Sequence, residues 1–244
     1  MENINEAPIG QLVVSDYRTA AIFKKYGIDF CCNGNRSIDA TCAGNTDQAD
    51  ALKEEIRHIL EMPTHGKEEG TDYSSWPLDL LADYIEKKHH RYVAEQIPVV
   101  TEYLEKLCRV HGYKHPELFE IRSLFSHCAE ELSAHMKKEE LMLFPFIRKM
   151  VAAKKGAGTT FSAPFNTVQN PIQVMMKEHQ VEGERFSKIR SLSDEYTPPA
   201  DGCNTYKVGY ALLEEFENDL HLHIHLENNI LFPKAIAMEG VFAC

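Results

Sequence analysis

A repeated pair of histidine and glutamate is the strongest chemical signal in this sequence. His135 precedes Glu139 by four residues, His223 precedes Glu227 by the same spacing, and in both copies the tripeptide Leu-Phe-Pro follows. Residues four apart share one face of a helix, and a single pair of this kind is typical of a solvated ion pair. The recurrence of the pair together with its apolar tail predicts two equivalent halves of one site.

The apolar tail indicates which way each pair points. Leu143 and Phe144 follow His135 by about two turns, on or beside the same helix face, and the second copy has the same residue types at the matching positions. A face that continues into large apolar side chains is expected to look into the core. Because a bare imidazole and carboxylate are costly to bury, these groups should be held by partners or by a metal ion.

Further histidines precede each repeat. His179 lies before the second copy, and both His89 and His90 lie at a similar distance before the first. A small residue follows one turn after His90, as it does after His179, and this favours His90. His89 instead continues the apolar stripe that contains Ile85, so the residues themselves leave both alternatives open.

The histidines around His223 raise a similar question. His221 and His225 are also four residues apart and could form a ligand pair. The register of the repeat selects His223, and we expect His221 and His225 to flank the site.

The resulting inventory is four imidazoles and two carboxylates. Two metal ions fit it, each with two histidines and both bridged by the carboxylates, whereas a single ion would leave half of the residues unused. Imidazole with carboxylate suits iron, with open positions for water, oxo or a small gas, and zinc is the alternative. Because few of the ligands are negatively charged, we expect iron in lower oxidation states and easier release of one ion.

Four long stretches of helical periodicity position these residues. The expected helices cover residues 77–110, 116–155, 170–195 and 204–238, and their modest connections favour an antiparallel four-helix bundle. Pro98, Pro145 and Pro233 lie inside three of the helices and should bend each helix or end its regular part. Strand patterns are nearly absent, so the predicted fold class is all-α.

A small helical domain is predicted before the bundle. Its first helix can be capped by Ser15 or Asp16 and stopped by Gly27, and its second can be capped by Asp47. The sequence predicts an N-terminal domain of residues 1–63, a linker of residues 64–76 and the bundle of residues 77–244.

Cys31 and Cys32 are adjacent in a sequence typical of a turn. Adjacent cysteines rarely bond to each other because the ring is strained. Exposed thiols in a turn can act in redox exchange or soft-metal capture, and two ordinary thiols are the alternative of equal weight. Cys42 is near enough in sequence to be a third participant. We interpret the other four cysteines as structural or incidental: Cys108, Cys128, Cys203 and Cys244.

Composition narrows the classes of function. The chain of 244 residues carries a formal charge of −11, with 37 acidic against 26 basic residues. It therefore offers no basic footprint for nucleic acid or an anionic membrane. No apolar run approaches the ~20 residues that span a bilayer. The N-terminus lacks the basic region of a signal peptide, and seven scattered cysteines do not form a secreted disulfide framework. We therefore expect a cytoplasmic protein.

Taken together, these motifs resemble those of a known family, the iron–sulfur cluster repair (RIC) di-iron proteins. Residues 9–14 with 26–32 resemble the short N-terminal domain of that family, and residues 135–145, His179 and 223–233 resemble its hemerythrin-like domain. The likeness covers nearly the whole chain, and the cysteine pair beside the doubled repeat makes it specific. The additional histidines and scattered cysteines depart from the family pattern without breaking the ligand set.

The resemblance implies a hemerythrin-like bundle with two non-haem iron ions, bridged by oxo and carboxylate groups. It selects His90 over His89, and the cysteine pair of the family maps onto Cys31 and Cys32, which would dock or reduce a client. The implied function is repair of iron–sulfur proteins damaged by nitrosative or oxidative stress, through donation of iron. The implied ligands are His90, His135, Glu139, His179, His223 and Glu227.

Two other functions fit the same residues. Two adjacent ferrous ions can bind two molecules of nitric oxide and supply two electrons, which would make the protein a reductase that forms nitrous oxide. A hemerythrin-type sensor would bind NO or O2 without turnover, although such a module has no need of the cysteine domain. The sequence does not fix the oligomeric state, and a homodimer is compatible with it.

Overall fold

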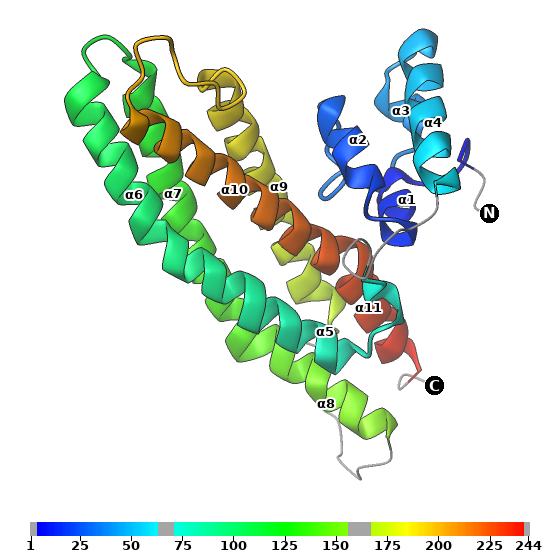
Figure 1. The fold of residues 1–244 in the computed structure, drawn as a ribbon. Helices are drawn as coiled ribbons and strands as arrows, with labels where there is room; N and C mark the ends of the chain where they lie inside the picture. The colour runs from blue at the N-terminus through cyan, green and yellow to red at the C-terminus, as the bar shows by residue number, and fades with distance from the viewer. Residues whose placement is uncertain (1–3, 63–70, 156–166, 242–244) are drawn as a thin grey trace. The chain divides into compact units, whose positions relative to one another are not determined.

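The computed structural model describes residues 4–62, 71–155 and 167–241, and within these ranges it contains helices and turns but no strand (Figure 1). The predicted all-α class is therefore confirmed. The chain divides into two compact units, one of residues 1–81 with 224–244 and the other of residues 82–223. Most of the predicted linker, residues 63–70, lies outside the described residues.

Four long helical runs follow the N-terminal region, and their ends agree with the predicted ranges to within about three residues. The first run is α5 (Leu78–Tyr84), η2 (Ile85–His90) and α6 (Arg91–His111); the second is α7 (Glu117–Lys138), η3 (Glu139–Leu143) and α8 (Phe144–Lys154); the third is α9 (Gln169–Leu192); the fourth is α10 (Asn204–Leu226), η4 (Glu227–Leu231) and α11 (Phe232–Gly240).

Aromatic side chains hold the four runs of the bundle together around Phe216 of α10. Its ring stacks on Phe186 of α9 at 5.7 Å between centroids and meets Phe125 of α7 edge-on at 5.3 Å. Tyr92 of α6 lies 6.3 Å from the same ring. Burial of each phenylalanine contributes roughly 1.5–3 kcal/mol. Because one residue from each helix joins this cluster, it fixes the helices around a common core.

The third run ends earlier than the sequence predicts. α9 stops at Leu192, and the chain leaves it through Asp194, Glu195 and Tyr196, which all have positive φ between 49° and 58°. The Tyr196 ring is buried beneath the guanidinium of Arg190, and the backbone N–H of Tyr196 donates to Ser193 Oγ. These contacts favour a tight turn over a further turn of helix.

Three π-helical segments interrupt the runs at the predicted metal residues. η2 ends at His90, η3 begins at Glu139 and η4 begins at Glu227. The N–H of Phe144 donates to the carbonyl of Glu139, and the N–H of Phe232 donates to the carbonyl of Glu227, each five residues back. The proline after each phenylalanine has no N–H with which to continue the α-helical ladder. The interruptions predicted at Pro145 and Pro233 lie one turn before these prolines, whereas α6 continues through Pro98 and η2 ends well before it.

The N-terminal region consists of short helices. They are α1 (Ile9–Ser15), α2 (Thr19–Lys25), α3 (Ile38–Thr41), α4 (Thr46–Glu61) and the 3-10 turn η1 (Tyr73–Ser75). Gly27 ends α2 with φ of +66°, as predicted. Of the predicted caps, Asp16 accepts the N–H of Arg18, the residue before α2, at 3.0 Å, whereas Ser15 and Asp47 do not act as predicted. Ser15 is the last residue of a separate helix, and Asn45, not Asp47, caps α4, because its Oδ1 accepts the Gln48 N–H at 3.1 Å.

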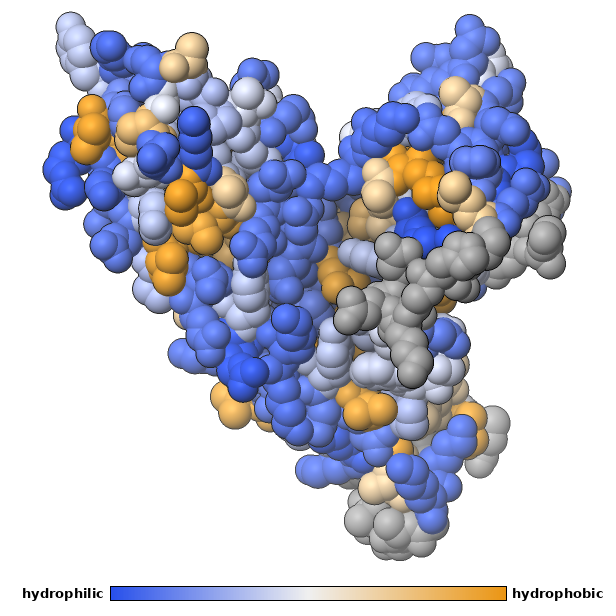
Figure 2. Space-filling model, viewed as in Figure 1, coloured by the Kyte–Doolittle hydropathy of each residue, from blue (hydrophilic) through white to orange (hydrophobic). Residues whose placement is uncertain are grey.

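Polar residues cover most of the visible surface, as expected for a chain with a charge of −11 (Figure 2). Within the described ranges, no helix combines the length and the apolar character that crossing a membrane requires.

Two glycines allow α1 and the turn at Gly34 to approach η4 closely. The N–H of Gly10 donates to the Gly34 carbonyl at 2.8 Å, and a Cβ added at Gly10 would lie 2.6 Å from Asn229 Oδ1. A Cβ at Gly34 would lie 3.0 Å from the same atom. A side chain at either position would displace Asn229.

We expect Gly10→Ala to lower the free energy of unfolding by about 1–3 kcal/mol, because the new methyl group overlaps Asn229. The matched control is Gly240→Ala, where an added Cβ meets no atom within 4 Å and stability should be unchanged or slightly higher. Urea denaturation followed by circular dichroism measures both. Equal midpoints for the two variants would contradict this account.

Candidate metal centre

Histidines from all four helical runs converge beside Glu139 inside the bundle. His90 ends η2, His135 lies in α7, His179 in α9 and His223 in α10, and each of the five side chains is at most 3% exposed. Donor atoms of His90, Glu139 and His223 lie within 4.8 Å of one another, and so do those of His135, Glu139 and His179. Glu139 therefore joins two groups of potential ligands.

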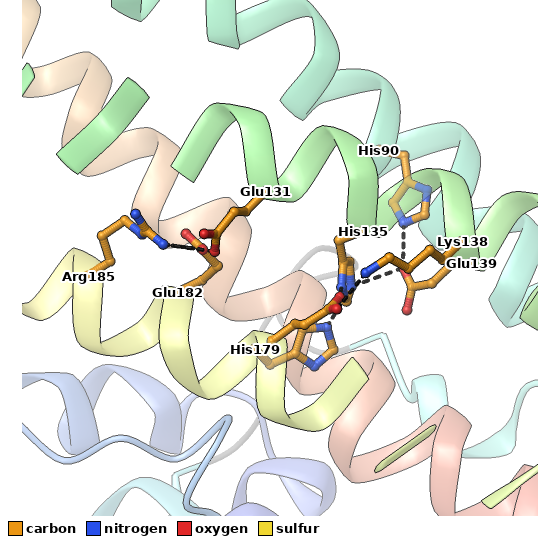
Figure 3. A network of polar contacts seen from close by, with 9 residues as sticks. His90, Glu131, His135, Lys138, Glu139, His179, Glu182 and Arg185 are labelled. Atoms are coloured by element: carbon orange, nitrogen blue, oxygen red, sulfur yellow. Dashed lines mark hydrogen bonds and ion pairs between the residues drawn. The ribbon is translucent and has the colours of Figure 1, made fainter. Parts of the chain in front are cut away.

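The distances within this cluster fit shared cations. Oε2 of Glu139 lies 3.4 Å from Nε2 of His90 and 3.4 Å from Nε2 of His135, as Figure 3 shows. Nε2 of His135 and Nε2 of His179 are 3.0 Å apart. Two imidazole nitrogens at right angles on one metal ion, each at about 2.1 Å, would be about 3.0 Å apart. The donor set and its spacing thus suit a metal ion in each half.

Carboxylates outside the cluster orient the imidazole rings. Nδ1 of His90 lies 2.9 Å from Oε1 of Glu140, and Nδ1 of His135 lies 2.8 Å from Oε2 of Glu178. The hydrogen bond from His135, with help from the Lys138 ammonium, lowers the pKa of Glu178 to about 2. Such partners fix the tautomer of a histidine and direct its other nitrogen to the metal. Here Nε2 of both rings is directed towards Glu139.

His89 is buried beside the cluster but belongs to neither group of ligand atoms among the described residues. Its ring is stacked on His223, with centroids 5.7 Å apart and planes inclined by 13°. Its Nδ1 lies 3.0 Å from Oδ1 of Asp219. The structure therefore brings His90 to Glu139 and leaves His89 as a neighbour of His223.

The two histidines that flank His223 have other partners. His221 is partly exposed and lies 4.0 Å from the carboxylate of Glu217. In the other unit, His225 is buried between the rings of Tyr17 and Phe30, and burial lowers the pKa of His225 to about 4. Within the part of the chain that the structure describes, neither histidine joins a ligand group.

Glu227 follows His223 by one helical turn in an unbroken helical run, and its side chain is fully buried. The continuity of the helix puts the two side chains on one face, as the repeat predicts.

The chain matches two family models and several named relatives. The model of the hemerythrin HHE cation binding domain matches residues 81–235, and that of a domain of unknown function (DUF542) matches residues 5–60. The chain is 35% identical over 234 residues to the iron-sulfur cluster repair protein YtfE of Enterobacter sp. (strain 638). This match covers 96% of this chain and 98% of the relative. The YtfE proteins of Escherichia coli O81 (strain ED1a) and Escherichia fergusonii show 35% and 34% identity with the same coverage.

The chain belongs to the YtfE family of iron–sulfur cluster repair proteins. The predicted family is thus confirmed, and the hemerythrin match spans both histidine–glutamate repeats. The N-terminal match spans Cys31 and Cys32.

A cavity of about 310 Å³ opens beside one half of the histidine–glutamate cluster. It borders His135 and His179 rather than the other two histidines, and its wall carries three glutamates together with Lys138. Burial raises the pKa of Glu182, one of the three. The lining residues are Glu131, Leu132, Ala134, His135, Lys138, Glu178, His179 and Glu182.

Sequence reasoning missed Glu140 and Glu178, the carboxylates that hold His90 and His135. Each is adjacent in sequence to a predicted ligand, and neighbouring helix positions do not normally face the same way. The outer nitrogen of an imidazole can reach a residue on the next helix, so sequence spacing carries no signal for these contacts.

We expect Glu139→Ala to abolish most metal binding in both halves, because its carboxylate belongs to both ligand sets. Glu178→Gln should lower metal affinity roughly 10–100-fold through the His135 half alone. Metal content per chain after anaerobic loading and gel filtration measures both effects.

The control for these variants is His221→Ala, which removes an imidazole from the same bundle outside both ligand groups and should leave metal content unchanged. Full metal content in Glu139→Ala would show that Glu139 does not link the two halves.

Proposed function

We propose that this protein holds two non-haem iron ions and repairs iron–sulfur clusters damaged by nitric oxide or oxidative stress, by donating iron to the damaged proteins. The main support is that two histidine pairs share one buried glutamate in a chain that is similar, over 96% of its length, to iron–sulfur cluster repair proteins.

The proposed ligands fall into two equivalent sets. His90 and His223 would hold one ion, His135 and His179 the other, and Glu139 would bridge them. Glu227 is proposed as the second bridge, because it is buried and repeats towards His223 the spacing of Glu139 towards His135. Four neutral imidazoles and two carboxylates suit ferrous iron without holding it as tightly as a carboxylate-rich site.

The cavity supports the assignment of readier iron exchange to one half. It borders His135 and His179, and its wall carries the carboxylates of Glu131, Glu178 and Glu182. A cation that leaves this half would therefore pass from two imidazoles into a cavity lined by carboxylates. We propose that the ion of the His135 half is the one donated.

Anaerobic transfer of isotopically labelled iron tests the proposal. The loaded protein is mixed with sulfide and a cluster-free ferredoxin, and the visible absorption of the rebuilt cluster is followed. We expect labelled iron in the cluster with the native protein and little with Glu139→Ala. Equal rates for the two proteins, or complete suppression by an external ferrous chelator, would contradict direct donation.

Reduction of nitric oxide is a second candidate, favoured by the same cavity, which borders His135 and His179 and would admit small gas molecules to that half of the proposed site. When bound, two ferrous ions supply the two electrons that coupling of two NO molecules requires. Nitrous oxide measured on the same samples separates the candidates, because donation of iron produces none.

A further inference from the structure

A second cluster of metal-binding side chains lies in the unit that contains the N-terminal helices. One donor atom each from Asp29, Cys31 and Cys32 lies within 4.8 Å of the others. The two Sγ atoms are 3.8 Å apart, and Oδ1 of Asp29 lies 3.2 Å from Sγ of Cys31. Cys42, the predicted third participant, does not belong to this cluster in the described part of the chain.

The sulfur spacing matches a shared cation rather than a disulfide. Sulfurs in a disulfide are about 2.05 Å apart. Two thiolates on one tetrahedral ion, each at about 2.3 Å, are about 3.8 Å apart, which is the distance between Cys31 and Cys32. An ion could therefore bind both sulfurs with little movement of the turn.

Hydrogen bonds to Asp29 hold the turn in this form. Its Oδ1 accepts the N–H groups of Cys31 at 3.1 Å and Cys32 at 2.9 Å, and its Oδ2 accepts Nδ2 of Asn33 at 2.6 Å. The carboxylate thereby stays on the side of the turn where the thiols lie. A preorganised set of ligands loses less conformational entropy when an ion binds.

The same turn is held from η4 by two amides. Nδ2 of Asn228 donates to the carbonyl of Cys31 at 3.1 Å, and Nδ2 of Asn229 donates to the carbonyl of Phe30 at 3.2 Å. These bonds fix the backbone of the turn at two consecutive carbonyls. The turn is therefore a supported part of its unit.

The surroundings of Cys31 favour a cation over a bare thiolate. Cys31 is 3% exposed, whereas Cys32 is half-buried and gives access from solvent. The hydrogen bond with Cys32, burial and the charge of Asp29 together raise the pKa of Cys31 well above its ordinary value. A divalent ion would neutralise the charges that make ionisation of this thiol unfavourable.

We propose that Asp29, Cys31 and Cys32 bind one divalent, thiophilic metal ion, Fe2+ or Zn2+, with a fourth position left open. Binding replaces the two thiol protons, which pass to solvent, and changes no oxidation state. Two thiolates and a carboxylate suit both ions. The site is separate from the ligand set of the bundle, so this inference does not depend on the proposed repair function.

Cobalt(II) tests the site in the full-length, reduced protein under anaerobic conditions. Only thiolate ligands give an intense sulfur-to-cobalt charge-transfer band in the near ultraviolet, so cobalt held by histidine and glutamate in the bundle does not contribute to it. We expect the band to saturate at one ion per chain and to disappear when Fe2+ or Zn2+ is added. Relative displacing concentrations identify the preferred ion, and displacement by neither would overturn the proposal.

Substitutions assign the band to the cluster. Cys32→Ser changes the more accessible thiol and should abolish the band while circular dichroism shows an unchanged fold. Cys31→Ser should do the same, and Asp29→Asn, which keeps an oxygen to cap the turn, should weaken binding at least about tenfold.

Two other thiols provide matched controls. Cys42→Ser alters a buried thiol of the same unit, and Cys203→Ser alters an exposed thiol beside His111, whose hydrogen bond lowers the pKa of Cys203 to about 7. Both variants should keep the full band. Absence of the band in the native protein, its loss in Cys203→Ser, or its persistence in a Cys31→Ser/Cys32→Ser double variant would overturn the proposal. Bundle iron measured on the same samples tests the repair function independently.

Discussion

The burial of one carboxylate among four imidazoles is the constraint on which the bundle depends. Glu139 is fully buried, and an uncompensated charge in such a place costs several kcal/mol. Its position within reach of His90 and His135 gives the carboxylate cationic partners once metal or protons are bound. The aromatic cluster around Phe216 supplies the packing that keeps these polar groups in place.

The π-helical segments are the backbone counterpart of this constraint. The carbonyls of Glu139 and Glu227 each accept the N–H of the phenylalanine five residues ahead, and the proline after each phenylalanine has no N–H with which to continue α-helical bonding. One added residue per turn rotates the following apolar tail relative to the glutamate. π turns at ligand positions are a common way to direct a side chain into a site. The Leu-Phe-Pro tail thus has a conformational role as well as a packing role.

The last helical run connects both clusters along the chain. His223 belongs to the bundle cluster, Glu227 follows by one turn, and Asn228 and Asn229 then hold the turn of Cys31 by its carbonyls. The small residue at Gly10 is required because α1 approaches the same amide. His223 of the bundle and the two asparagines that hold the cysteine turn therefore lie within about seven residues of one another in the sequence.

The sequence by itself determined the features that arise from local periodicity. Helical spacing predicted the four runs, the inward face of each repeat and the grouping of His135 with Glu139, because residues four apart are neighbours in any α-helix. It did not determine the caps at Asn45, the separate helix α1 or the early end of α9, since these depend on competing hydrogen bonds and on burial of Tyr196.

Only the tertiary structure decided which groups meet across helices. The sequence pattern left His89 and His90 as alternative ligands. The packing of η2 turns His90 towards Glu139 and His89 towards His223. Glu178 reaches His135 from another helix, and Asp29 gathers two thiols through the backbone of a turn. Contacts of this kind join residues whose separation in sequence has no fixed period, so they follow from the packed fold and not from the pattern that folds it.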